Sequence, residues 1–148
     1  MADRLALLFA DYAEHHQNPR NRWCHMIGIP LIAFSLLGLL AVEAFPVGGV
    51  RLDWAVVLVV LLAPVYLRLD ARLGAVLILA YLLLYGLARQ LSWPVHLVLF
   101  VLGWIFQFVG HGVYEKRSPA FFKNLIHLVV GPLWVTNHLI RLRPEAKT

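Results

Sequence analysis

Four long apolar runs, none with a Lys or Arg, constrain this chain of 148 residues more than any other feature. They extend over 26–45, 52–67, 73–88 and 95–109. As α-helices, runs of this size would span roughly 22–30 Å, close to a hydrocarbon core of about 30 Å. They lack the two-residue alternation of barrel strands. Because 61% of the residues are hydrophobic and 14% charged, the composition excludes a typical soluble enzyme domain and favours a helical membrane protein.

The basic residues indicate how many runs cross the membrane. A fifth apolar stretch, 125–140, contains Gly131-Pro132, which we expect to interrupt a helix. With four spans, 11 of the 13 Lys and Arg lie on the side of both termini and 2 on the other, whereas a fifth span would change the split to 8 and 5. Because cytoplasmic loops collect Lys and Arg, we expect four spans with cytoplasmic termini. The fifth stretch is then a re-entrant or interfacial segment.

The residues before the first run have the pattern of an amphipathic helix. Leu5, Leu8, Phe9, Tyr12 and His16 fall on one helical face. The expected fold is therefore all-α, a single membrane-embedded domain over 1–148. It combines an N-terminal amphipathic helix, a bundle of four transmembrane spans and the C-terminal segment. The net charge of +5 is interpreted as a topology signal and not as a nucleic-acid surface.

Seven histidines are unusual in a chain with so few polar residues. Under the four-span prediction only His96 lies on the outer side, where we expect it at the interface. We expect His15 to be exposed. Several imidazoles at one depth favour a site for iron, zinc, copper or nickel. The six cytoplasmic histidines are His15, His16, His25, His111, His127 and His138.

Two polar residues lie four positions from His111, on its helical face. Glu115 is interpreted as a metal ligand, as a partner that orients a histidine, or as an ion-pair partner of Lys116 or Arg117. Gln107 lies inside an apolar run, where a buried amide needs a partner. It either holds a ligand in place or bonds to another helix.

Two strings make the chain recognisable. The first, YAEHHQNPRNRWCH, extends over 12–25, and the second, GWIFQFVGHGVYEKRSPA, over 103–120. Together they resemble the membrane family of the yeast-type 2-hydroxy fatty acid dioxygenase. The resemblance covers nearly the whole chain, although the middle runs resemble the family in hydropathy only.

The resemblance implies an Fe(II)-dependent enzyme that uses O₂ to convert a 2-hydroxy fatty acid into the acid shorter by one carbon. The histidines that match the family's motifs are implied to be iron ligands and catalytic residues. Three polar residues that match motif positions are implied to hold these ligands in place. The yeast-type protein has no histidine that matches His15, His96, His127 or His138, so a fourth ligand, His127 or His138, stays open. The ligands are His16, His25 and His111, and the supporting residues Asn21, Gln107 and Glu115.

Physical chemistry agrees with such a site in a bilayer. A 2-hydroxy carboxylate chelates iron through two oxygens, while its acyl chain lies among apolar spans. The carboxylate is expected near the basic side chains at the interface, which are Arg20, Arg22, Lys116 and Arg117.

Other functions remain open at this stage. They are a metal-dependent lipid enzyme with another substrate, a non-enzymatic scaffold or lipid-binding protein, and a haem electron carrier, which would need paired histidines inside facing spans. The abundance of Arg, Ala, Leu and Val favours a bacterial inner membrane, with the endoplasmic reticulum as the eukaryotic counterpart. The sequence does not determine the oligomeric state.

Overall fold

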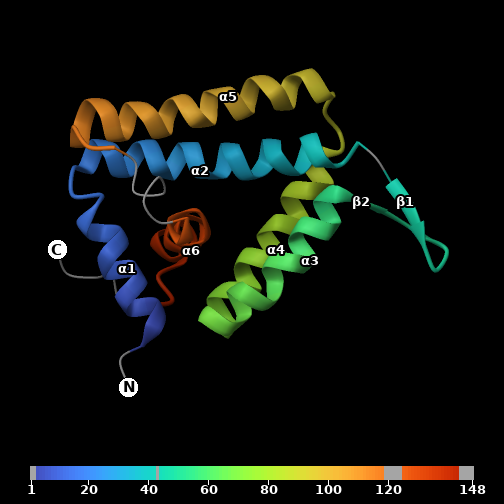
Figure 1. Cartoon of the computed structure of the whole chain (residues 1–148), viewed down its shortest axis with the longest axis horizontal. Coiled ribbons are helices and arrows are strands. Elements are labelled where there is room, and N and C mark those ends of the chain that lie inside the picture. Colours follow the sequence, from blue (N-terminus) through green and yellow to red (C-terminus); the bar gives the residue numbers. More distant parts are fainter. Residues whose placement is uncertain (1–2, 43, 119–124, 144–148) are drawn as a thin grey trace. The chain divides into compact units, whose positions relative to one another are not determined.

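The structure, a computed structural model, describes residues 3–42, 44–118 and 125–143, and nearly all of its regular elements are helices (Figure 1). By contacts the chain divides into two compact units, Met1–Pro30 with Gly103–Thr148, and Leu31–Leu102. The expected single domain stays a prediction. The elements are α1 (Arg4–Glu14), α2 (Pro19–Leu40), β1 (Ala44–Val47), β2 (Val50–Asp53), α3 (Trp54–Leu69), α4 (Ala71–Ala88), α5 (Trp93–Val109), η1 (Gly110–Glu115) and α6 (Ile126–Ile140).

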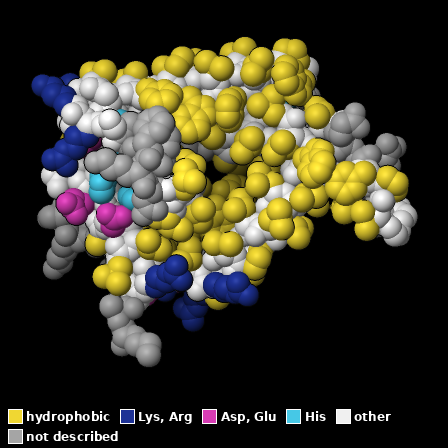
Figure 2. Space-filling view, in the orientation of Figure 1, with side chains coloured by type: hydrophobic (Ala, Val, Ile, Leu, Met, Phe, Trp, Pro, Cys, Tyr) yellow, Lys and Arg dark blue, Asp and Glu magenta, His cyan; other side chains and the backbone are white. Residues whose placement is uncertain are grey.

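Three helical segments of the described chain are long and apolar enough to cross a membrane. They are α2, α4 and the continuous run Trp93–Glu115, formed by α5 and η1. Hydrophobic side chains cover most of the helical surface in Figure 2, as expected of surfaces that face lipid. The prediction of membrane helices is thus confirmed in outline. The fourth expected span corresponds to α3, which has 16 residues and reaches only about 24 Å.

A β-hairpin follows α2, where the sequence predicted only the end of the first run. Strands β1 and β2 pair antiparallel, with Val47 opposite Val50. Gly48 and Gly49 both have positive φ, 56° and 84°, which a two-residue type I′ turn requires. The all-α prediction is corrected to this extent. Gly-Gly between β-formers is a hairpin signal, and the sequence contains it at Gly48-Gly49.

The expected interruption at Gly131-Pro132 is wrong, because α6 continues through both residues. Tertiary packing overrides the local preference of proline here. A Cβ on Gly131 would lie 3.0 Å from Ile29 Cδ1 and 3.4 Å from the Tyr12 hydroxyl. The glycine therefore allows close packing of α6 beside α1 and α2, and Thr136 Oγ1 donates to the Pro132 carbonyl at 2.8 Å.

His96 is buried within its own unit, and its expected place at the outer interface stays a prediction. Its Nε2 lies 2.9 Å from the Ala88 carbonyl oxygen, and the residue is 1% exposed. The ring occupies the space that a Cβ on Gly38 would fill, at 2.2 Å. His96 thus serves helix packing, because the missing side chain at Gly38 gives the imidazole a place between α2 and α5.

Candidate metal centre

The first unit brings three segments together at the start of α2. The apolar face of α1 buries Leu5, Phe9 and Tyr12, as the sequence predicted. After α1, Asn18 Oδ1 accepts a hydrogen bond from the Arg20 amide, an N-cap arrangement that begins α2. His16 therefore lies between two helices, and His25 lies less than two turns into the second.

The third histidine comes from the far end of the sequence. After α5 the backbone widens into the π-helical segment η1, which holds His111. Such π-helical turns are frequent at functional sites, because the extra residue re-aims the side chains. Lys116 ends the segment in the left-handed conformation, with φ at 53°.

His16, His25 and His111 converge in the structure, as the resemblance implied. Each residue is at most 3% exposed. The ring centroids are 4.3 Å apart for His16 and His25, 4.9 Å for His16 and His111, and 4.8 Å for His25 and His111. Each ring offers one nitrogen to a group whose atoms lie within 4.8 Å of one another. The cluster can therefore hold a metal ion.

The hydrogen bonds assign the tautomers of two of these rings. Nδ1 of His16 lies 2.5 Å from the Tyr12 carbonyl oxygen, and Nδ1 of His25 lies 3.0 Å from that of Asn21. Since a carbonyl only accepts, both Nδ1 atoms carry the proton. The two Nε2 atoms, 3.0 Å apart, then face each other with lone pairs. A cation between them removes this repulsion, and nitrogens bound to one zinc-like ion lie about 3.4 Å apart.

Burial holds His16 in the neutral form that metals require. Its pKa is lowered from 6.5 to about 2, first by burial and then by the neighbouring His25. A metal ligand must give up its proton, so a low pKa removes the competition between proton and metal near pH 7.

The same pKa predicts how the metal-free protein responds to acid. Below pH 6.5 the unfolded chain binds a proton at this residue and the folded chain does not, down to about pH 2. The free energy of unfolding therefore decreases as the pH is lowered, and this group contributes a decrease of up to about 1.4 kcal/mol per pH unit. Unfolding of the metal-free protein in detergent at pH 7 and pH 5 should show a loss of about 2 kcal/mol. A His16→Gln variant should lose this part of the pH dependence, and an unchanged slope would contradict the assignment.

Glu115 and Asn21 connect the ends of the site instead of joining the three-histidine cluster. Glu115 Oε1 accepts from the Asn18 amide at 2.6 Å and from Asn21 Nδ2 at 3.2 Å. Asn21 also supplies the carbonyl that fixes His25. That carboxylate oxygen already has two donors. The geometry therefore favours one of the three roles that the sequence left open for Glu115, that of a partner that orients a histidine. The same hydrogen bonds link η1 to the start of α2.

Gln107 lies deeper, where α5 passes α2. Its Nε2 is buried and has no hydrogen-bond partner among the described residues. A Cβ on Gly28 would lie 2.3 Å from this nitrogen. The Gln107 amide thus occupies the space left by the missing side chain of Gly28 in α2. The described contacts of Gln107 include neither of the two that the sequence predicted, a bond to another helix or a bond that holds a ligand in place.

Sequence reasoning did not assign Tyr12 or Asp11 to the site, yet the structure brings both to the histidines. Tyr12 stacks on His16, with ring centroids 4.0 Å apart, and its carbonyl fixes the same ring. Asp11 lies 3.0 Å from His127 Nε2. Their four-residue spacings to His16 and His15 place each pair on one helical face, and this signal was available.

The remaining candidates separate into distinct environments. His127 joins Asp11 and His15 in a second group, and His138 stacks on Trp134. Neither belongs to the three-histidine cluster. His15, expected to be exposed, has a side chain that is 35% exposed and contacts Asp11.

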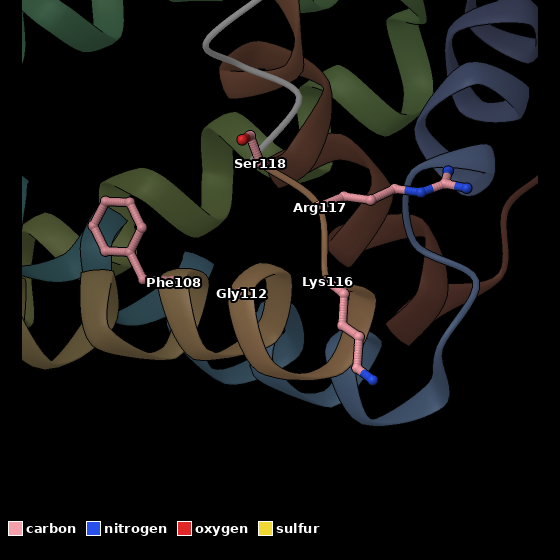
Figure 3. Close-up of a pocket in the computed structure, with 5 residues that line it drawn as sticks. All are labelled: Phe108, Gly112, Lys116, Arg117 and Ser118. Carbon is pink, nitrogen blue, oxygen red and sulfur yellow. The ribbon is translucent and has the colours of Figure 1, made fainter.

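Two of the four basic candidates, Lys116 and Arg117, line the pocket described in this part of the chain. Arg22 Nε donates to the His16 carbonyl at 2.7 Å, and the Arg20 guanidinium lies over the Tyr114 ring at 5.7 Å. Lys116 and Arg117, which follow His111 in the sequence, line a hollow of about 460 Å³ (Figure 3). Its other described lining residues are Phe108, Gly112 and Ser118.

Buried imidazoles that converge on one point define a class, a helical protein with apolar spans and a candidate histidine metal centre. Comparison with known proteins then gives the family. The chain belongs to the Mpo1-like family, whose description is 2-hydroxy-palmitic acid dioxygenase Mpo1-like and which matches residues 2–142. This confirms the resemblance found in the two strings.

A curated relative agrees with the family. The chain is 36% identical over 126 residues to 2-hydroxy-palmitic acid dioxygenase MPO1 of Saccharomyces cerevisiae, and the match covers 84% of this chain and 72% of that protein. The relative is eukaryotic and lends no support to the bacterial inner membrane that composition favoured. No solved structure matches the chain.

Proposed function

We propose that this protein is an iron-dependent dioxygenase that converts a 2-hydroxy fatty acid into the acid shorter by one carbon, with His16, His25 and His111 as the metal ligands. The observation that carries the proposal is the pair of facing, unprotonated Nε2 atoms of His16 and His25, with His111 beside them. The printed name of the yeast relative supports the substrate class. Bound iron would supply the activation of O₂ and a chelating position for the hydroxyl and carboxylate oxygens.

The protein's own residues hold the ligands and the substrate. The Tyr12 and Asn21 carbonyls fix the tautomers of two imidazoles, and burial keeps the cluster dry. Lys116 and Arg117 attract the substrate carboxylate, because Arg20 and Arg22 are already engaged. Phe108 gives the same hollow an apolar wall for the first carbons of the chain.

The proposed function is tested with purified protein in detergent, loaded with Fe(II) and supplied with O₂ and 2-hydroxypalmitate. Pentadecanoate should form, in amounts that depend on iron, and palmitate without the hydroxyl group should give none. An iron-loaded protein that consumes 2-hydroxypalmitate without forming the shorter acid would overturn the reaction. One that ignores all 2-hydroxy acids would overturn the substrate class.

The role of Glu115 is testable by two substitutions. Glu115→Gln keeps one carbonyl oxygen for the Asn18 and Asn21 donors, so it should bind iron nearly as well as the wild type. Glu115→Ala removes the acceptor and should lower iron affinity about 10- to 100-fold, as loss of outer-shell partners does. Iron content after dialysis at graded free Fe(II) measures both. Equal loss in the two variants would instead make the carboxylate a ligand.

The role of the hollow is testable through steady-state kinetics. Changing Lys116 and Arg117 together to Gln should raise KM for 2-hydroxypalmitate several-fold, roughly 3- to 10-fold, because exposed charge pairs contribute about 0.2–1 kcal/mol each. The value of kcat should change little. Changing Arg68 and Arg72 to Gln gives a control with the same loss of charge in the other unit. An unchanged KM would remove the hollow from substrate binding.

The membrane orientation completes the proposal. The distribution of Lys and Arg supports four spans, with α3 as the shortest, and cytoplasmic termini. A short α3 needs a locally thinned bilayer or a contribution from flanking residues.

A further inference from the structure

A second cluster of candidate metal-binding side chains lies in the first unit, and the Tyr12 ring contacts both this cluster and His16. Asp11, His15 and His127 each offer one atom to a group that lies within 4.8 Å. The Tyr12 ring is stacked both on His16, at 4.0 Å between centroids, and on His127, at 5.8 Å. The two clusters are therefore neighbours but share no residue.

The geometry inside this cluster is close to what a metal ion needs. His127 Nε2 lies 3.0 Å from Asp11 Oδ2, and His15 Nδ1 lies 3.7 Å from Asp11 Oδ1. Atoms bound to one ion through bonds of about 2.1 Å are separated by about 3.4 Å. His15 Nδ1 also lies 2.9 Å from the Asp11 carbonyl oxygen and therefore carries a proton, as in His16 and His25, so Nε2 is the His15 nitrogen that can ligate. The His15 ring must rotate before all three residues can bind one ion.

His127 is the most buried member of this cluster. The His127 side chain is 7% exposed, and its Nδ1 is buried with no hydrogen-bond partner among the described residues. Burying an imidazole nitrogen without a partner costs free energy. The nitrogen that faces Asp11 is Nε2, so an ion in this cluster would bind Nε2 and would leave the cost at Nδ1 unchanged.

The ligand set suits a transition metal. Two imidazoles and one carboxylate hold zinc in many enzymes and iron(II) in many oxygenases, with positions left open. Calcium and magnesium prefer oxygen ligands throughout. The side chains of His15 and Asp11 are 35% and 45% exposed, so water reaches the ion from their side.

We propose that Asp11, His15 and His127 form a second site for a divalent transition metal, separate from the three-histidine centre and weaker because it is open to solvent. It binds zinc or iron(II) by exchange with the surrounding water. The site depends on Asp11, which the proposed oxygenation chemistry does not use.

The test is a cobalt(II) titration of the full-length, metal-free protein in detergent, followed by visible absorbance and by elemental analysis after dialysis. We expect two equivalents of cobalt, the second bound at least tenfold more weakly than the first. Asp11→Asn and His127→Gln, which keep hydrogen-bonding groups, should each retain only the tight equivalent. His16→Ala should retain only the weak one. Circular dichroism checks that each variant is folded.

Two outcomes would overturn the proposal. The first is saturation of the wild type at one equivalent. The second is a weak equivalent that persists in Asp11→Asn, the variant at an exposed side chain and so least able to disturb folding. The function of the three-histidine centre is judged separately, since His16→Ala and Asp11→Asn remove different equivalents.

Discussion

Alanine in place of His16, His25 or His111 is expected to lower turnover about 10³-fold or more and to remove tightly bound iron. Each substitution leaves two imidazoles where three converge, and the metal contributes several kcal/mol of transition-state stabilisation that is lost with it. Product formation from 2-hydroxypalmitate and iron content by elemental analysis measure the two effects. The three variants should resemble one another, because the ligands act as a unit.

His138→Ala is the matched control. It removes an imidazole from α6 that stacks on Trp134 and lies outside the three-histidine cluster. Iron content and turnover should stay near wild-type values. Full activity in a folded His25→Ala protein would disprove the assignment of ligands, and loss of iron in His138→Ala would make this residue the fourth ligand that the sequence left open.

Gly110→Ala is expected to have the second-largest effect, although it changes no ligand. The added Cβ would lie 2.3 Å from Asn21 Oδ1 and 3.0 Å from Cys24 Cβ, so η1 and α2 must move apart. Overpacking of this kind costs about 1–3 kcal/mol. Because His111 follows directly, we expect iron affinity to fall by about tenfold or more, measured by dialysis against graded free Fe(II).

Gly112 provides the control for this steric argument. It lies in the same π-helical segment, on the other side of His111, and a Cβ there would meet nothing within 4 Å. Gly112→Ala should therefore bind iron as the wild type does. If both variants lost iron equally, backbone conformation rather than the contact with Asn21 would be the cause.

The helices of the fold were predictable because their signals are local. Apolar runs without Lys or Arg identified α3 to α5 within two residues at each end, and α2 less closely, since it begins at Pro19. Leu5, Phe9 and Tyr12 identified the buried face of α1. The errors also have local causes. Gly131-Pro132 has the pattern of a break, yet close packing against Tyr12 and Ile29 keeps α6 intact.

The candidate site was predictable in its residues but not in its geometry. The resemblance of the two strings to the family implied His16, His25 and His111, and the structure brings them together. The sequence left three roles open for Glu115, and the bonds to Asn18 and Asn21 favour the one that orients a histidine. The packing of His96 was not evident in the sequence, because it depends on the missing side chain of Gly38, far away in the sequence.

The sequence by itself determined an apolar helical chain with imidazoles confined to a few segments, since hydrophobicity and helical period act between near neighbours. Only the tertiary structure decided which of those imidazoles meet and what fixes their protons. The bonds from Asn18 and Asn21 to Glu115 join residues more than 90 positions apart, and the contact of Asp11 with His127 joins residues 116 apart. Such contacts depend on the packing of whole helices, because no local preference brings residues so distant in sequence within bonding distance.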